Sequence, residues 1–223
     1  MSTVDNWFTN MVKLNVDDTD KIALFDLDGS LADYEGQLLN DLLALRSPTE
    51  PELWVERNGI MNYGTLHQLE KEMPWIKARI DLIKSQPGWW RNLPMLVKGK
   101  RVFDMALTIG FNNKVLTKGP KRKPLAWAEK LEWSHQHLGE DTEVTITFDK
   151  SDVYGRVLYD DYPEYVYAWL KNRPRGLVIM PVPHYIQEHN HPRVVQYDGT
   201  NGDQVYRALS IAYNRQPHES LIL

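Results

Sequence analysis

The acidic pair Asp26 and Asp28 directly follows the short apolar run "IALF" and precedes Gly29. Two carboxylates this close repel each other unless a cation lies near them or one of them keeps its proton. A second pair, Asp160 and Asp161, follows the apolar run "VLY" in the same way. If both runs are strands of one parallel sheet, their carboxyl ends meet at the edge where such sheets bind ligands. The spacing therefore predicts four carboxylates that converge on one cation.

Mg²⁺ is the cation that this set of ligands favours. The chain contains no cysteine, so thiolate ligands are excluded, and no histidine cluster accompanies the acidic pairs. Mg²⁺ prefers hard oxygen ligands and commonly binds one or two carboxylates together with a substrate phosphate. Each pair also has a simpler interpretation. "DLDGS" also suits a solvated turn, and Asp160 and Asp161 alone suit the N-terminal cap of a helix that begins at Pro163. A calcium loop fits less well, because Gly29 is fourth in its loop and follows a strand.

Groups that could hold a phosphate lie downstream of the first acidic pair. Thr117 and Lys118 stand in "LTKGP", after another apolar run, and offer a hydroxyl, backbone N–H groups and a cation. Lys130 and Lys150 are further cations that could neutralise phosphate charge. Phosphoryl transfer spreads negative charge over the equatorial oxygens, so cations and N–H or O–H donors stabilise it.

Short apolar runs bounded by polar residues are typical of parallel strands that are covered on both faces. Such runs predict strands at Ile22–Phe25, Lys114–Leu116, Val157–Tyr159 and Leu177–Met180, and the alternating "EVTITF" predicts a more exposed strand at Glu143–Phe148. Helical patterns fall between them at 101–110, 124–139 and 163–173. This alternation predicts an α/β fold with a doubly wound, mainly parallel Rossmann-like sheet.

The segment from Gly36 to Lys98 interrupts the alternation. It has no convincing strand, and its apolar residues recur at the i, i+3, i+4 spacing of amphipathic helices. We expect residues 36–98 to form a small helical cap over one end of the sheet, with residues 1–35 and 99–223 forming the core. Extra helices that cover the sheet are the alternative. The sequence assigns no function to residues 1–20 or to Val194–Leu223.

The whole chain is typical of a globular protein: 223 residues, 42% hydrophobic and 25% charged. A net charge of -4 gives no general attraction to nucleic-acid polymers or to membrane surfaces. No apolar run approaches membrane-spanning length, and the first residues do not read as a secretion signal. We therefore expect a cytoplasmic protein.

The motif "FDLDGS" resembles the start of phosphatases in the haloacid dehalogenase superfamily. Further stretches resemble the 5′(3′)-deoxyribonucleotidases in order and approximate spacing, namely "DLDGSLADYE", "PGWWRNLP", "EKLEWSHQHLG" and "TFDKSDVYGRVLYDDYPEYVYAW". The resemblance extends from about Ile22 to Met180. It implies a Mg²⁺-dependent phosphomonoester hydrolase acting through an aspartyl-phosphate, with (deoxy)nucleoside monophosphates as substrates.

The resemblance also implies roles for individual residues. Asp26 is expected to be the nucleophile, and Asp28 the general acid and base. The metal is expected to bind a carboxylate oxygen of Asp26, the backbone carbonyl of Asp28, and Asp160, with Asp161 close by. Thr117 is expected to hold phosphoryl oxygens, Lys130 to balance the charge of nucleophile and phosphate, and Lys118 and Lys150 to add phosphate contacts.

The chain departs from these relatives beside Thr117, where Lys118 replaces a small hydroxyl residue. The basic run "KGPKRKP" also offers Lys121, Arg122 and Lys123 for the role given to Lys130. Among the aromatic residues of the insertion, Trp89 and Trp90 are the candidates for contact with a nucleobase. A phosphatase for a sugar phosphate or another small phosphomonoester, and a nucleotide-binding protein without turnover, are the alternative functions. Homodimerisation is left open.

Overall fold

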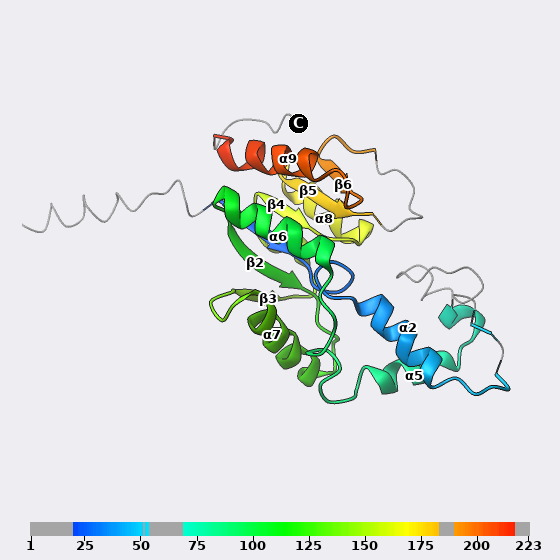
Figure 1. Cartoon of the computed structure of the whole chain (residues 1–223). Helices are drawn as coiled ribbons and strands as arrows, with labels where there is room; N and C mark the ends of the chain where they lie inside the picture. The colour runs from blue at the N-terminus through cyan, green and yellow to red at the C-terminus, as the bar shows by residue number, and fades with distance from the viewer. Residues whose placement is uncertain (1–19, 51, 54–68, 183–189, 217–223) are drawn as a thin grey trace, which may run out of the picture.

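The computed structural model describes residues 20–50, 52–53, 69–182 and 190–216. Its centre is a six-stranded sheet in which every neighbouring pair of strands is parallel (Figure 1). The strands are β1 (Ile22–Phe25), β2 (Asn112–Thr117), β3 (Val144–Ile146), β4 (Val157–Tyr159), β5 (Leu177–Pro181) and β6 (Val194–Tyr197). Their spatial order is β3-β2-β1-β4-β5-β6, which is the doubly wound Rossmann-like order. The predicted fold class is therefore confirmed.

All five strands predicted from the sequence are present. β1 and β4 have the predicted bounds, β2 and β5 are longer, and β3 is shorter than "EVTITF" and is only partly buried. β6 was not predicted. It is a four-residue strand at the edge of the sheet with alternating burial, so its apolar pattern is too short to distinguish it from a loop.

The helices are α2 (Tyr34–Ala44), α5 (Ile76–Ile83), α6 (Val97–Ile109), α7 (Pro124–Leu138), α8 (Pro163–Asn172) and α9 (Gly202–Asn214). The last four lie against the sheet. α6 and α9 contact each other on one face (Figure 1), whereas α8 packs on the other. Successive strand residues point to opposite faces. Phe25 therefore packs against Phe103 of α6, while Leu24 joins Trp169 of α8.

The helical segment between β1 and α6 extends away from the sheet (Figure 1). In its described part, α2 and α5 contact each other through buried leucine and isoleucine side chains. The stretch of chain that enters this segment lies next to the stretch that leaves it. Leu96 N–H donates to the Leu31 carbonyl at 2.8 Å, and Asp33 N–H donates to the Pro94 carbonyl at 2.8 Å. Residues 31–33 and 94–96 therefore form a paired connection to the core.

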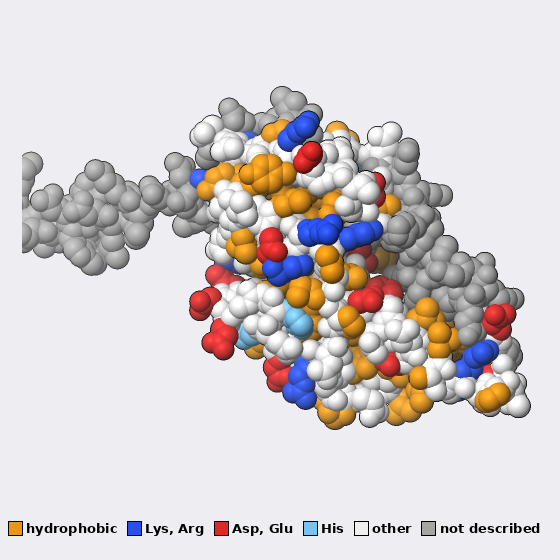
Figure 2. Space-filling model, viewed as in Figure 1, with side chains coloured by type: hydrophobic (Ala, Val, Ile, Leu, Met, Phe, Trp, Pro, Cys, Tyr) orange, Lys and Arg blue, Asp and Glu red, His pale blue; other side chains and the backbone are white. Residues whose placement is uncertain are grey.

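Acidic, basic and hydrophobic side chains are interspersed over the face covered by α6 and α9 (Figure 2). In the ranges that the structure describes, no helix combines the length and apolar character needed to cross a bilayer.

Candidate active site

The candidate site lies where the order of the strands reverses. β1 and β4 are neighbours, but their chain connections run to opposite sides of the sheet. Asp26 directly follows β1, and Asp160 directly follows β4. The N–H of Asp26 donates to the Tyr159 carbonyl at 2.9 Å, which continues the pairing of β1 with β4. The acidic residues thus lie at the carboxyl ends of strands at a topological switch point, the usual ligand position in this architecture.

Gly29 lets the chain turn sharply after β1. Its φ of +75° lies in the left-handed region, which residues with a Cβ rarely adopt. A Cβ at this position would also lie 2.5 Å from Oδ2 of Asp161. Ser30 follows and donates from its hydroxyl to Oδ1 of Asp161 at 3.1 Å. The turn therefore needs glycine both for its backbone angles and for the space that Asp161 occupies.

Lys150 joins the ends of the two central strands. Its Nζ lies 2.7 Å from Oδ1 of Asp26 and 2.7 Å from Oδ2 of Asp160, and all three side chains are buried. Burial disfavours the charge on Lys150, but Asp160 and Asp26 outweigh this effect and raise the pKa of Lys150 above its usual range. Lys150 begins a short 3-10 helix (Lys150–Asp152), capped by the Asp149 side chain, which accepts from Ser151 N–H.

Three carboxylates form a cluster that fits a metal ion. One oxygen each of Asp26, Asp160 and Asp161 can be chosen so that all lie within 4.8 Å of one another. Burial raises the pKa of Asp160 to about 6, against the opposing effect of Lys150, and burial together with Glu35 and Asp160 raises the pKa of Asp161 well above its ordinary value. Asp160 and Asp161 therefore keep their protons to a higher pH than ordinary aspartates do unless a further cation is present. Hard oxygen ligands around this excess of negative charge suit Mg²⁺.

Asp28 faces a different lysine. Its Oδ2 accepts from Lys130 Nζ at 2.6 Å, and the same nitrogen donates to Thr117 Oγ1 at 3.0 Å and to the Lys118 carbonyl at 2.9 Å. Oδ1 of Asp28 is buried and has no hydrogen-bond partner among the described residues. Burial raises the pKa of Asp28, against the opposing effect of Lys130. Asp28 is thus better able than an ordinary aspartate to hold a proton near neutral pH.

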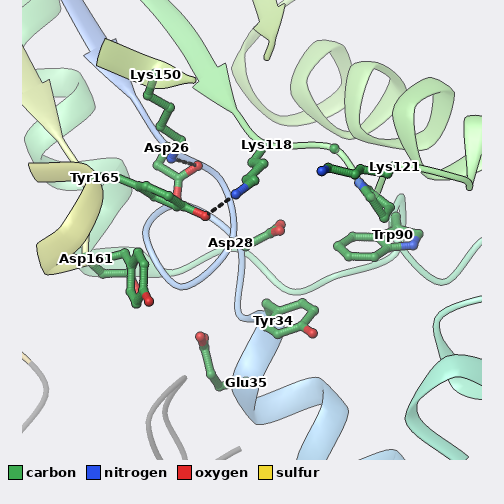
Figure 3. A pocket seen from close by; sticks show the side chains of 13 residues that line it. Asp26, Asp28, Tyr34, Glu35, Trp90, Lys118, Lys121, Lys150, Asp161 and Tyr165 are labelled. Atoms are coloured by element: carbon green, nitrogen blue, oxygen red, sulfur yellow. Dashed lines mark hydrogen bonds and ion pairs between the residues drawn. The ribbon is translucent and has the colours of Figure 1, made fainter. Parts of the chain in front are cut away.

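A pocket of about 300 Å³ opens in front of these groups (Figure 3). Its lining residues are Asp26, Asp28, Tyr34, Glu35, Trp90, Lys118, Gly119, Pro120, Lys121, Lys150, Asp161, Tyr162 and Tyr165. Lys118 Nζ donates to the Tyr165 hydroxyl at 2.8 Å, and the same nitrogen lies 4.9 Å from the centre of the Tyr165 ring. Aromatic rings, cations and carboxylates therefore share one small-molecule pocket.

Tyr34 and Trp90 form an aromatic wall of this pocket (Figure 3). Their rings are stacked, with centroids 5.7 Å apart and planes 22° apart. Trp90 also lies under Lys130, whose Nζ is 4.8 Å from the centre of the Trp90 ring. Trp89 is not among the lining residues, and its indole N–H donates to Asp41 at 2.7 Å. Of the two tryptophans predicted to contact a base, the structure brings only Trp90 to the pocket.

The turn that carries both tryptophans is tied to α7. The buried carboxylate of Glu129 accepts from Gly88 N–H at 2.6 Å and from Trp90 N–H at 3.1 Å. Trp133, one turn further along α7, donates to the Leu93 carbonyl at 2.8 Å. Glu129 directly precedes Lys130 in the sequence. The same turn of α7 therefore binds the backbone of residues 88–90 through Glu129 and the side chain of Asp28 through Lys130.

The structure brings most of the predicted site residues together, but it distributes the lysines differently. Lys150, which was expected to be a further phosphate contact, forms an ion pair with Asp26. Lys130, which was expected to balance the charge of the nucleophile and phosphate, instead donates to Asp28 and Thr117. Of the three alternative basic residues, Lys121 lines the pocket, and Lys123 instead donates to Ser85 and to the Asp81 carbonyl.

Among the lining residues with polar or charged side chains, sequence reasoning missed four. Tyr34 and Glu35 belong to "ADYE", directly after the first acidic motif, and Tyr162 and Tyr165 follow the second one. These four residues could have been predicted, because each lies within about seven residues of an aspartate of the acidic motifs. Burial raises the pKa of Glu35 to about 7, and the carboxylates of Asp28, Asp33 and Asp26 act in the same direction.

This chain is similar to known proteins over most of its length. Residues 20–208 match the family model described as "5' nucleotidase, deoxy (Pyrimidine), cytosolic type C protein". A Bordetella pertussis protein described as "Putative 5'(3')-deoxyribonucleotidase" is 28% identical over 176 residues, which cover 78% of this chain and 90% of the relative. A protein of the same description from Bordetella bronchiseptica is 27% identical, again over 78% of this chain and 90% of the relative.

Among solved structures, a Burkholderia xenovorans protein described as "a putative haloacid dehalogenase-like hydrolase" matches with a TM-score of 0.46 and 17% identity. The match covers 87% of this chain and 98% of that one. The fold assignment depends on the strand order rather than on this likeness. Because the family model spans most of the chain, including both acidic motifs, this protein belongs to the 5′-nucleotidase, deoxy (pyrimidine), cytosolic type C family and is a phosphatase.

Proposed function

We propose that this protein hydrolyses (deoxy)nucleoside monophosphates through an aspartyl-phosphate on Asp26, with Mg²⁺ as cofactor. One observation carries the proposal. The buried Asp26 carboxylate forms an ion pair with Lys150 at the topological switch point, next to Asp160 and Asp161. Asp28 is paired with a different lysine, Lys130. Two neighbouring carboxylates in different environments suit two different roles.

In the first step, a carboxylate oxygen of Asp26 attacks phosphorus and forms a P–O bond. The bond from phosphorus to the leaving oxygen of the nucleoside breaks, and Asp28 gives its proton to that oxygen. A carboxylate is a known covalent nucleophile for phosphoryl groups. Lys150 holds the Asp26 side chain and counters its charge.

In the second step, Asp28 removes a proton from water as the water oxygen attacks phosphorus. The P–O bond to Asp26 breaks, which releases phosphate and restores the carboxylate. The raised pKa of Asp28 supports its role as acid in the first step. Thr117, at the end of β2, and Lys118, which lines the pocket, are proposed to contact phosphoryl oxygens, and Lys130 to orient Asp28.

Asp26, Asp160 and Asp161, with the backbone carbonyl of Asp28, are the proposed Mg²⁺ ligands. The bound cation would lower the repulsion between the anionic nucleophile and the anionic phosphate. Support comes from the oxygen ligands and from the raised pKa values of Asp160 and Asp161.

The nucleotide part of the proposal is supported by the family and relatives, whose descriptions are those of nucleotidases. The stacked Tyr34 and Trp90 rings provide a flat apolar wall suited to a nucleobase. We also propose that residues 36–98 act as a cap that closes over the pocket. A cytoplasmic location belongs to the same proposal.

The test is phosphate release from a panel of nucleoside 5′- and 3′-monophosphates and sugar phosphates, each with Mg²⁺ and with a chelator. We expect turnover of nucleotides that requires Mg²⁺. Equal turnover with chelator would refute the metal part of the proposal. Faster turnover of sugar phosphates would refute the nucleotide part, and nucleotide binding without phosphate release would refute the reaction.

A further inference from the structure

A second cavity, of about 220 Å³, lies at the opposite end of the sheet from the candidate active site. It is lined by Tyr154, Gly155, Asn172, Arg173, Pro174, Arg175, Gly176 and Arg215. These residues precede β4 and β5 or follow α9, so the cavity opens at the amino ends of the strands. The active-site pocket opens at their carboxyl ends. We refer to the second cavity as the arginine cavity.

The arginine cavity is strongly cationic. Three guanidinium groups line it, and none of the lining residues is acidic. The neighbouring Arg156 is buried and pairs with Asp20 at 2.6 Å, so this carboxylate already has a cation. Burial, Arg156 and Arg175 together lower the pKa of Arg215. The cluster therefore holds several like charges together without an equal number of anions.

Two of the three guanidinium groups have unused hydrogen-bond donors. Arg215 is only 9% exposed, and its Nη1 donates to the Arg175 carbonyl, yet its Nε is buried and has no partner within the described residues. Arg173 donates through Nη1 to the Asn172 carbonyl at 2.9 Å and through Nη2 to the Asp152 carbonyl at 3.1 Å, and its Nε is also buried without a described partner. A buried donor that lacks a partner is costly, so these groups favour an external acceptor.

We propose that the arginine cavity is a binding site for phosphoryl groups. Guanidinium groups bind phosphate oxygens through paired N–H donors, and this geometry is the usual reason for arginine clusters at phosphate sites. A volume of about 220 Å³ is smaller than the ordinary range of drug-sized ligand pockets, which suits a phosphate or diphosphate group. The cavity is separate from the active-site pocket, so this inference does not depend on the proposed reaction.

Binding is tested by calorimetric titration of the full chain with inorganic pyrophosphate, in the presence of a chelator and at ionic strength matched with sodium chloride. Arg175 is the residue to vary, because it is exposed and no described hydrogen bond uses its side chain. We expect saturable binding by the wild type and binding weakened about tenfold or more by Arg175→Gln, since one charged donor group is lost. Arg175→Lys should recover part of the affinity.

Two control variants locate the ligand. Arg207→Gln removes an exposed cation from α9 outside the cavity, and Lys118→Gln removes a cation from the active-site pocket. Arg207→Gln should bind pyrophosphate as the wild type does. Lys118→Gln should weaken any second binding event at the active-site pocket and should keep the binding event that Arg175→Gln weakens. The proposal is overturned if the wild type shows no saturable binding, if Arg207→Gln weakens binding as much as Arg175→Gln, or if Lys118→Gln alone abolishes it.

A second titration series distinguishes free phosphates from nucleotides. A nucleoside diphosphate that binds with the affinity of pyrophosphate, and with the same loss in Arg175→Gln, would support recognition of the phosphoryl groups alone. Binding at least tenfold tighter than pyrophosphate, again lost in Arg175→Gln, would support a nucleotide whose nucleoside contacts the cavity rim. Binding of the diphosphate that is unaffected by Arg175→Gln would count against the arginine cavity.

Discussion

Nζ of Lys150 lies 2.7 Å from Oδ1 of Asp26, and both side chains are buried. The same nitrogen also contacts Asp160, so one cation joins the residues that directly follow β1 and β4. This arrangement fixes the proposed nucleophile before any substrate arrives. It also means that the charge of Asp26 can be removed without leaving Lys150 alone.

Asp26→Asn should abolish turnover while leaving the fold intact. The amide is a poor nucleophile, so we expect phosphate release to fall by roughly 10³-fold or more. Lys150 keeps Asp160 as its partner, so the melting temperature should change little. Phosphate release and thermal unfolding are measured on the same preparation. Near-normal turnover in this variant would contradict the assignment of the nucleophile.

Asp28→Asn should affect substrates according to their leaving group. General acid catalysis contributes roughly 10²- to 10⁴-fold, and we expect a loss in this range for a nucleoside monophosphate. p-Nitrophenyl phosphate releases an oxygen that needs no protonation, so its first step should be affected much less. Burst kinetics with this substrate isolate that step. Equal losses in the first step for both substrates would argue against Asp28 as the acid.

Lys118→Ser places a small hydroxyl residue beside Thr117 and removes a cation from the pocket. Because Lys118 is held toward the pocket by Tyr165, we expect KM for nucleotides to rise roughly tenfold, with a smaller change in kcat. Lys121→Ser is the matched control, since Lys121 also lines the pocket but lies over Phe148, 5.7 Å from the ring centre. An equal effect of both substitutions would show that only the overall charge of the pocket matters.

We expect Glu35 to make the metal-free protein less stable as the pH rises. In the unfolded chain Glu35 ionises near its ordinary pKa of 4.5, whereas in the folded chain it keeps its proton up to about pH 7. Between these values the folded state binds more protons, so the free energy of unfolding decreases with increasing pH. We expect a decrease of roughly 1 to 3 kcal/mol from this group, allowing for its partial exposure.

The measurement is thermal unfolding from pH 4.5 to 8 in chelator, for the wild type and for Glu35→Gln. The variant should lose less stability over this range, although Asp160, whose pKa is raised to about 6, still contributes at the acidic end. Identical pH dependence in the two proteins would mean that Glu35 has an ordinary pKa in the folded chain.

Gly29→Ala should weaken Mg²⁺ binding. The new Cβ would lie 2.5 Å from Oδ2 of Asp161, so this carboxylate must move. We expect the Mg²⁺ concentration for half-maximal turnover to rise roughly 10- to 100-fold, as for other changes next to a metal ligand. Gly139→Ala is the matched control, because Gly139 also has a positive φ, +111°, but has nothing within 4 Å of the added Cβ. A similar Mg²⁺ requirement in both variants would refute the steric argument.

The sheet and its acidic edge could be predicted because they depend on local patterns. Buried parallel strands are continuous apolar runs, and residues that follow such runs must lie at one edge of the sheet. β6 and α9 could not be predicted in this way. β6 has only two buried residues, and α9 begins within "NGD", whose residues are equally typical of a turn.

The distribution of the two buried lysines could not be read from the sequence either. Lys130 is on α7 and Lys150 begins a 3-10 helix. The aspartates that they contact, Asp28 and Asp26, follow β1 and are far from both lysines in the sequence. Which aspartate each lysine meets depends on the packing of α7 and on the path of the chain after β3. The same holds for Trp89 and Trp90, which are adjacent in sequence but have separate partners, since Trp89 donates to Asp41 and Trp90 to the Lys84 carbonyl.

The attachment of the helical segment has a mechanical consequence. Residues 31–33 and 94–96 are hydrogen-bonded to each other, and the returning chain is held by Glu129, the residue next to Lys130. A rotation of the segment would move residues 31–33 and 94–96 together, because they are hydrogen-bonded to each other. It would also displace the turn of α7 that carries Glu129 and Lys130. A change in the position of the segment would therefore act, through Glu129, on the adjacent lysine that holds the carboxylate of Asp28.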